Sequence, residues 1–342
     1  MTLTQAEAAG GEITARGPWP GPGLGSVGRG TRSIVTIVVQ SLVVFVIASF
    51  VTFSLGAISG SNPAAVALGD MATPEDIARL NQVYGLDQPF LVRYLTWLGN
   101  ALTGDLGVSW FSGIPVAQSI AQAFPVSLSI ALGATLVAII LGAGSGILAA
   151  VTRGSWIDRG ITAACAVLAT IPAFVAGIAL ILLFAFAIPI FPVGGYTPPE
   201  VSFGGWLACL VLPSIALSLD AAADLSRQLR TSLVGALAQN YIVGATVHSL
   251  ARRRIVIGHA LPNALGPAVA TLGLHIPRLI GGAVITEAVF GMPGLGLVAR
   301  QSALSGDVPV VQGVLLVAVS LVIVSGVIVN LILSRSGERS VA

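Results

Sequence analysis

The side chains of this sequence that could do chemistry are a few ionisable residues inside long apolar stretches. Only 9% of the 342 residues are charged, whereas 55% are hydrophobic. Asp220, Arg278 and Glu287 fall within or beside apolar stretches. A charge at the centre of a membrane helix costs roughly 2.5 to 3.5 kcal/mol on insertion scales, so each group needs a partner or water. We therefore expect them to face the interior of a helix bundle and, with His275, to be candidates for a substrate pathway.

Two alternatives remain open for the environment of Asp220. It could pair with Arg278 across two neighbouring spans, because each charge is otherwise uncompensated. Alternatively, it lies at the cytoplasmic edge of the membrane, since Arg227 and Arg230 follow it closely. The residues alone do not decide between these two environments.

Several kinds of chemistry are excluded by what the chain lacks. The sequence contains no lysine, so all sixteen basic residues are arginine. A nucleotide-binding P-loop and a Schiff-base site both require a lysine, and no spacing brings a nucleophile beside a base. Of the three histidines His248, His259 and His275, two fall in one polar loop, so we expect no metal cluster within the membrane. We predict no catalytic residue, metal site or cofactor on this chain, with any ATP and Mg²⁺ bound by another polypeptide.

Six apolar stretches are each long enough to cross about 30 Å of hydrocarbon as a helix. They cover residues 34–58, 126–151, 161–190, 204–223, 263–288 and 310–333. The predicted fold class is all-α and integral to the membrane, with six transmembrane helices. The net charge is only +2, and no basic patch is interleaved with aromatic residues, so nucleic acid is not expected as a partner.

The more polar segments divide the chain into regions. Residues 1–32 are rich in glycine and contain three prolines, so we expect a disordered tail before a first transmembrane helix at 33–58. An element at 59–125 and five further helices within 126–334 follow, and 335–342 form a second tail.

The distribution of arginine predicts the orientation. Twelve of the sixteen arginines lie in the two tails and in the loops 152–160 and 224–262. By the positive-inside rule, these segments face the cytoplasm. We therefore expect a multi-pass protein of the inner (plasma) membrane with both termini in the cytoplasm.

Residues 59–125 are too polar to enter lipid and too long for a simple turn, so we expect a small helical element outside the membrane, on the extracytoplasmic side. Apolar residues recur at helical spacing between Phe90 and Leu102. Pro115 opens a second short helical stretch that ends before Pro125. Packing on the outer ends of the spans is favoured for these amphipathic helices over direct contact with a substrate.

The longest cytoplasmic connection, residues 225–262, is predicted to form two short helices, 225–238 and 241–252. Apolar side chains flank the small residues Gly244 and Ala245, a pattern that suits docking into a groove on a partner protein. The three consecutive arginines at 252–254 equally favour a helix that lies on anionic membrane lipid. These residues alone leave both partners open.

The stretch Tyr241–Pro267, YIVGATVHSLARRRIVIGHALPNALGP, resembles the EAA loop of ABC importer permeases in the dipeptide, oligopeptide and nickel branch. Similar resemblance extends over segments 85–110, 115–120, 191–196 and 285–314. Two positions depart from the family pattern: Asn240 replaces an acidic residue, and Ser249 stands where a glycine normally permits a tight turn. The residues that the resemblance assigns to a coupling loop are Tyr241, Gly244, Ala245, Ser249, Leu250, Arg253, His259, Leu261 and Pro262.

The resemblance implies a type I ABC importer fold and transport by alternating access. Its implied partners are two ATPase subunits that dock on the loop, a second homologous permease and an extracytoplasmic substrate-binding protein. Di- or oligopeptides are the expected cargo, with nickel or another small solute as the alternative. Glu287 matches a family position, whereas Asp220, His275 and Arg278 do not and are candidates for cargo preference. A competing class is a secondary transporter in which Asp220 and Glu287 couple to an ion gradient.

Overall fold

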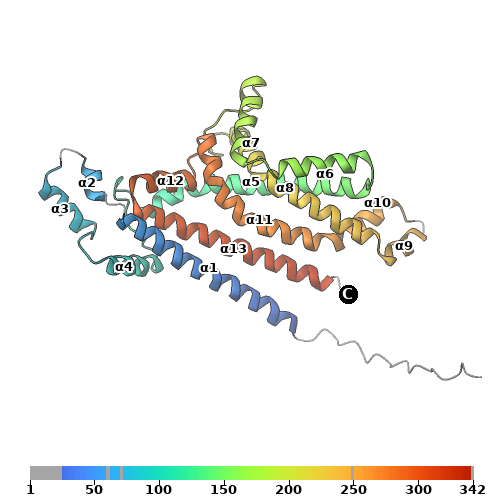
Figure 1. Cartoon of the computed structure of the whole chain (residues 1–342), viewed down its shortest axis with the longest axis horizontal. Helices are drawn as coiled ribbons and strands as arrows, with labels where there is room; N and C mark the ends of the chain where they lie inside the picture. Colours follow the sequence, from blue (N-terminus) through green and yellow to red (C-terminus); the bar gives the residue numbers. More distant parts are fainter. Residues whose placement is uncertain (1–24, 59–61, 70–71, 248–249, 340–342) are drawn as a thin grey trace, which may run out of the picture.

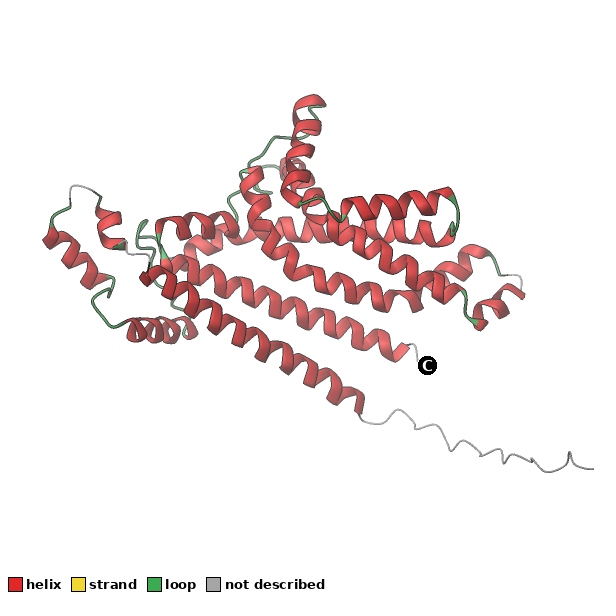
Figure 2. Cartoon of the chain, viewed as in Figure 1, coloured by secondary structure: helices red, strands yellow, loops and turns green. Residues whose placement is uncertain are grey.

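The chain folds into a bundle of helices. A computed structural model describes residues 25–58, 62–69, 72–247 and 250–339, and no strand occurs among these residues. Long helices run side by side through the bundle, and shorter helices lie at its two ends (Figure 1, Figure 2). This architecture confirms the predicted all-α fold class.

The elements follow one another with short connections. In chain order they are α1 (Gly25–Ile58), α2 (Pro63–Leu68), α3 (Pro74–Val83), α4 (Phe90–Leu102), α5 (Val116–Val151), α6 (Trp156–Leu168), α7 (Ala173–Ile181), η1 (Leu182–Ala187), α8 (Phe203–Leu237), α9 (Asn240–Val247), α10 (Arg252–Arg254), η2 (Ile255–Ala260), α11 (Leu261–Phe290), α12 (Leu295–Ser305) and α13 (Val308–Arg339). The two η segments are π-helical, a wider winding that is rare and short in proteins.

By length and composition, the described residues contain five helical stretches able to cross a membrane, and a sixth if one bent pair counts as a span. The five are Val38–Gly56, Val116–Val151, Phe203–Leu237, Arg252–Phe290 and Val308–Ile332. The pair consists of α6 and the segment Ala173–Ala187, which meet at 104°. Pro172 lies at this bend, where it disfavours helical backbone in the residue before it. The six predicted apolar stretches are all found, but the third is broken rather than straight.

Two of the short helices predicted from the sequence belong to long ones. The helix expected to end before Pro125 is the beginning of α5, which continues through the proline to Val151. Burial of Ala123 and Val126 on either side of Pro125 holds the helix together despite the hydrogen bond that proline cannot donate. The helix expected at 225–238 is likewise the end of α8.

Other boundaries also shift. The helix predicted at 241–252 is divided, because α9 ends at Val247 and α10 starts at Arg252. At the termini, α1 begins at Gly25 and α13 extends to Arg339, so both include residues assigned above to tails. The predicted disorder of residues 1–24 and the last three residues of the second tail lie outside the described part of the chain.

Close contact between α5 and α8 forms the centre of the bundle. A Cβ atom added at Gly142 or Gly146 would lie 2.8 or 2.7 Å from the backbone oxygen of Ala222 or Ser226, respectively. Small residues let helix backbones approach each other in membranes, where packing and hydrogen bonds drive association. A side-chain hydrogen bond of 2.8 Å between Ser145 and Ser226 adds to this contact. These residues fix α5 and α8 as one unit.

The two ends of the bundle differ in what they carry. The start of α1, the end of α13 and the helices α9 and α10 lie at one end, which we call the elbow end. The helices α2, α3 and α4 lie at the other, the insertion end (Figure 1). A chain with an even number of spans returns to the side on which it began, as the described ends do here.

The insertion, residues 62–115, is attached to the bundle by hydrogen bonds to Asp307. The Asp307 carboxylate accepts a hydrogen bond from the Ser109 hydroxyl at 2.5 Å and another from the backbone N–H of Trp110 at 3.2 Å. Burial raises the pKa of the Asp307 carboxyl above its ordinary value, although these hydrogen bonds oppose the shift. Within the insertion, α4 occupies Phe90–Leu102, as its apolar spacing predicted.

Candidate functional site

The elbow, residues 238–262, turns the chain from α8 back into α11 at the elbow end of the bundle (Figure 1). Among its described residues, the buried side chains are those of Ile242, Ile255, Val256 and Ala260. These apolar residues anchor α9 and η2 to the spans. In a free linker, each of the two isoleucines and the valine would stay in water at a cost of about 1.5 to 3 kcal/mol.

The buried cluster that includes these elbow residues also joins three spans. Leu229 and Leu233 contribute from α8, Ala150 from the end of α5, and Ala264 and Ala268 from α11. Protein interiors are close-packed and transmit strain. A displacement of the elbow therefore acts on α5, α8 and α11 together.

The outer face of the elbow is open and includes exposed apolar side chains beside its arginines. Tyr241, Val247 and Ile257 are exposed, and no heavy atom lies within 4 Å of the position that a Cβ atom on Gly244 would occupy. This face is the part of the elbow that a partner could reach.

The nine predicted coupling residues divide between the two faces. Three of them, Ala245, Leu250 and Leu261, are partly buried and pack against the cluster. Five are exposed: Tyr241, Gly244, Arg253, His259 and Pro262. Ser249, the departure from the glycine pattern, lies outside the described residues together with His248.

Polar contacts tie the elbow to the spans beside it. The Asn263 amide donates hydrogen bonds to the Tyr241 hydroxyl at 3.1 Å and to the His259 carbonyl at 2.9 Å. The Arg252 guanidinium donates one to the Val151 carbonyl at the end of α5, at 2.8 Å. One of the three consecutive arginines is therefore occupied by the protein, although lipid contact by its neighbours stays open.

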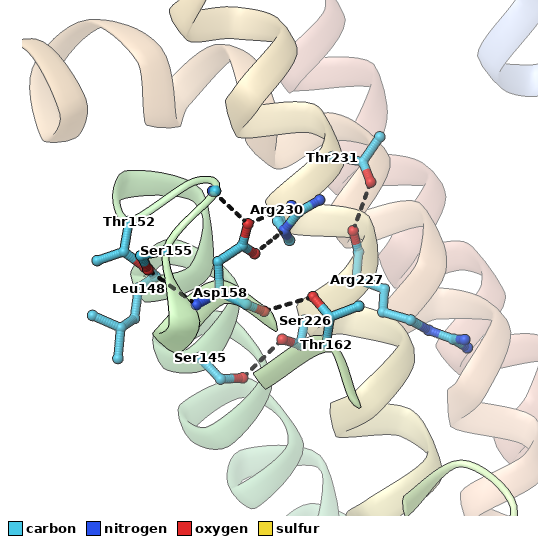
Figure 3. A network of polar contacts seen from close by, with 11 residues as sticks. Ser145, Leu148, Thr152, Ser155, Asp158, Thr162, Ser226, Arg227, Arg230 and Thr231 are labelled. Atoms are coloured by element: carbon cyan, nitrogen blue, oxygen red, sulfur yellow. Dashed lines mark hydrogen bonds and ion pairs between the residues drawn. The ribbon is translucent and has the colours of Figure 1, made fainter. Parts of the chain in front are cut away.

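A second tie at this end joins α6 to α8 (Figure 3). The Arg230 guanidinium donates two hydrogen bonds to the Asp158 carboxylate, at 2.5 and 2.7 Å. The backbone N–H of Gly154 donates a third, at 2.9 Å, so the turn before α6 is held as well. This pair was not predicted from the sequence; its one local signal is Ser155, which caps α6 three residues before the aspartate.

Asp220, Asp224 and His275 form a polar bridge between α8 and α11. Nε2 of His275 lies 3.0 Å from Oδ2 of Asp224, and Nδ1 lies 3.7 Å from Oδ2 of Asp220. The imidazole is 3% exposed. The two aspartates are one helical turn apart on α8, so both reach the same face of α11. We call these three residues the polar bridge.

The structure does not show the hypothesised pair of Asp220 and Arg278 among the described residues. Asp220 lies beside the His275 ring, and among the described residues no ion pair joins it to Arg278, which is exposed. Asp224 was not among the predicted residues, although its spacing of four from Asp220 was visible in the sequence. It also forms an ion pair with Arg227.

A cavity of about 340 Å³ lies beside the polar bridge. Asp220, His275 and Arg278 line it together with the bend between α6 and α7, residues 169–173. Three of the four predicted pathway residues thus share one cavity. The ligand-type atoms of the polar bridge also lie within 4.8 Å of one another, so the expectation that the chain holds no metal remains a prediction.

Glu287, the fourth predicted pathway residue, does not line this cavity. Its carboxylate is fully buried and accepts hydrogen bonds from the Ser127 hydroxyl at 2.6 Å and from the backbone N–H groups of Gly296 and Leu297 at 2.8 and 3.0 Å. A carboxylate at a helix N-terminus satisfies donors that have no partner within the helix. Glu287 therefore holds the start of α12 against α11 and α5.

Comparison with known proteins adds to this geometry. A family model described as the inner membrane component of binding-protein-dependent transport systems matches residues 142–339, and a model of the N-terminal part of such components matches residues 31–131. The chain belongs to this family of permeases. The permease thus has the membrane-embedded role that its apolar helices predicted, and the resemblance read from the elbow motif is confirmed.

Individual relatives align with the permease over most of its length. A protein of Brucella abortus named "Putative peptide transport system permease protein" is 35% identical over 90% of this chain and 98% of its own. The probable D,D-dipeptide transport system permease protein of Escherichia coli is 33% identical over 82% of this chain and 89% of its own length. The oligopeptide transport system permease protein of Bacillus subtilis is 30% identical over 87% of this chain and 96% of its own length.

A solved structure supports the fold. A chain from inward-facing conformations of the MetNI methionine ABC transporter matches 64% of the permease and 97% of its own length, with a TM-score of 0.53 and 19% identity. At this identity the likeness concerns the fold alone, and it confirms the type I importer architecture. The roles assigned to individual elbow and cavity residues stay predictions.

Proposed function

We propose that this permease forms the membrane pathway of an ATP-driven importer of short peptides. The observation that carries the cargo class is the alignment, over more than four fifths of the chain, with relatives named as peptide, D,D-dipeptide and oligopeptide permeases. Nickel or another small solute is the alternative cargo.

Separate ATPase subunits bind ATP and Mg²⁺ and dock on the elbow. Three observations support this step: the chain has no lysine for a P-loop, the outer face of the elbow is open and includes exposed apolar side chains, and its inner face is packed into three spans. Closure of the ATPase subunits moves the elbow, and the buried cluster passes the movement to α5, α8 and α11. In this way ATP binding and hydrolysis on the ATPase subunits change access to the pathway in the permease.

Two further partners complete the importer. A substrate-binding protein delivers cargo at the insertion end, in keeping with the family description, and a second homologous permease supplies the other half of the pathway. The elbow end faces the cytoplasm, as does each terminus, because most of the arginines lie there. The cavity beside the polar bridge lies on the cargo route and influences which solute passes.

The test is transport by the complex isolated from its native membrane and reconstituted into liposomes. Labelled di-, tri- and pentapeptides are offered with binding protein on the outside and ATP on the side of the elbow. We expect peptide uptake that stops when ATP is omitted and persists when ionophores collapse all ion gradients. Uptake of Ni²⁺ instead of peptide would move the proposal to the alternative cargo. Gradient-driven uptake by vesicles containing this chain alone would identify a secondary transporter and refute the proposal.

A further inference from the structure

The helix α4 is packed on one side and bare on another. On the side toward α1, Tyr94 is buried, and its ring meets those of Phe50 and Phe53 edge-on at centroid distances of 5.4 and 5.6 Å. On a neighbouring face, about 80° to 100° round the helix from Tyr94, Leu95 is 62% and Leu102 is 83% exposed. No described part of the protein covers these side chains.

The contacts of α4 place it beside the membrane-crossing part of α1. The Tyr94 hydroxyl lies 2.9 Å from the hydroxyl of Ser49, and the rings of Trp97 and Phe45 are 6.4 Å apart. At a rise of 1.5 Å per residue, Ser49 lies about 10 Å and Phe45 about 16 Å before Gly56, where the apolar span of α1 ends. Half of the hydrocarbon core measures about 15 Å. Thus α4 lies level with one leaflet, not above the membrane.

The apolar surface of α4 continues that of α1. Phe50 of α1 is exposed and also contacts the ring of Phe90 at 5.5 Å, so it connects the lipid-facing side of the span with the first turn of α4. Leu91 stands next to this contact and is exposed. Water cannot cover one part of a continuous apolar surface while acyl chains cover the adjoining part at the same depth.

The charges around α4 lie away from its exposed leucines. Arg93 is the one charged residue within Phe90–Leu102, and it lies 5.5 Å from the ring centroid of Phe53, on the side toward α1. Asp87 and Asp105 flank the helix outside its two ends. The exposed leucines of α4 therefore have no charged residue of this helix beside them that contact with acyl chains would have to bury.

We propose that α4 is embedded in the leaflet at the insertion end of the bundle, with Leu91, Leu95 and Leu102 in contact with lipid acyl chains. Under the orientation proposed above, this is the outer leaflet. The insertion is therefore anchored to the membrane surface through α4, and α3, which carries Glu75, Asp76 and Arg79, stands in water above it. The expectation that residues 59–125 fold wholly outside the membrane is revised for α4.

Lipid and water quenching of a single fluorophore test this location. Cys165 and Cys209, both buried and free, are replaced by alanine, and Leu95→Cys in α4 or Ala78→Cys in α3 is labelled with a nitrobenzoxadiazole dye. The complete importer is reconstituted into phosphatidylcholine liposomes, with or without doxyl-labelled phosphatidylcholine. We expect the dye at position 95 to be quenched severalfold more strongly by the doxyl lipid than the dye at 78, and severalfold less by iodide in the water.

Other outcomes overturn the proposal in distinguishable ways. Iodide quenching at 95 equal to that at 78 would place α4 in water, and protection from both quenchers would show that a protein subunit covers it. Leu102→Cys repeats the measurement at a second site if Leu95→Cys does not assemble. Because doxyl lipid is present in both leaflets, the result does not depend on the proposed orientation or on transport activity.

Discussion

Replacing Gly146 by alanine is predicted to force α5 away from α8, next to the buried cluster that joins the elbow to the spans. The added Cβ atom would lie 2.7 Å from the Ser226 carbonyl oxygen and 3.1 Å from its Cα, whereas ordinary contact begins at 3.4 Å, so the two helices must separate locally by about 0.7 Å. Overpacking of this kind costs typically 1–3 kcal/mol. The Ser145–Ser226 hydrogen bond lies within the same contact and would lengthen with the separation.

Gly144 provides a matched control on the same helix, because a Cβ atom added there meets nothing within 4 Å. Both substitutions gain about the same 1 kcal/mol of helix propensity, so their difference isolates the contact with α8. Chemical or thermal unfolding of the purified complex measures stability, and cargo-stimulated ATP hydrolysis measures coupling. We expect Gly146→Ala to be less stable than Gly144→Ala by about 1–3 kcal/mol and to lose stimulation. Equal stability of the two variants, within about 0.5 kcal/mol, would refute the reasoning.

Three further predictions concern buried polar groups. Glu287→Gln keeps one carbonyl oxygen for the N–H groups of Gly296 and Leu297, but it removes the charge and puts an NH₂ where the carboxylate accepts from the Ser127 hydroxyl. The docking of α12 should therefore weaken by about 1–3 kcal/mol, measured by unfolding; stability equal to wild type would contradict this role. Because burial raises the pKa of Asp307, its ionisation opposes folding, so stability falls as pH rises from about 4 through the raised value. The variant Asp307→Asn should lack that decline in thermal melts, and identical pH profiles would be inconsistent with the raised pKa. Asp224→Asn should reduce stability by about 1 kcal/mol, a larger loss than that caused by Asp220→Asn, because Asp224 is the closer partner of His275. A larger loss in Asp220→Asn would show that the polar bridge is arranged differently.

The parts of the fold that depend on local pattern were predictable from the sequence. A run of more than twenty apolar residues without charges indicates a span whatever its neighbours, and the periodic spacing within Phe90–Leu102 indicated α4 with correct ends. Proline was a weaker guide. It marked the break at Pro172 but not the continuation through Pro125, because packing on both sides outweighs one lost hydrogen bond.

The interactions that depend on distant residues were not predictable in the same way. Asp158 and Arg230 are 72 positions apart, and nothing local shows that α6 returns along α8. The charge on Asp220 predicted a partner on a neighbouring span. Which residue of α11 faces Asp220, His275 rather than Arg278, depends on the rotation of α11, and packing along the whole helix sets that rotation. Composition likewise indicated that 59–125 is more polar than the spans, without showing that one of its helices lies level with the membrane.

The central claim is that the elbow receives a separate ATPase subunit on its exposed face. In the importer purified without native cysteines, Gly244→Cys places a photoactivatable crosslinker on that face, and Ala78→Cys places it on α3 at the opposite end of the bundle. Mass spectrometry of the crosslinked products identifies what each position touches. The account predicts that position 244 crosslinks to a nucleotide-binding subunit, in a yield that changes when ATP is added, and that position 78 does not. Absence of an ATPase crosslink at 244, or its appearance at 78, would contradict the account.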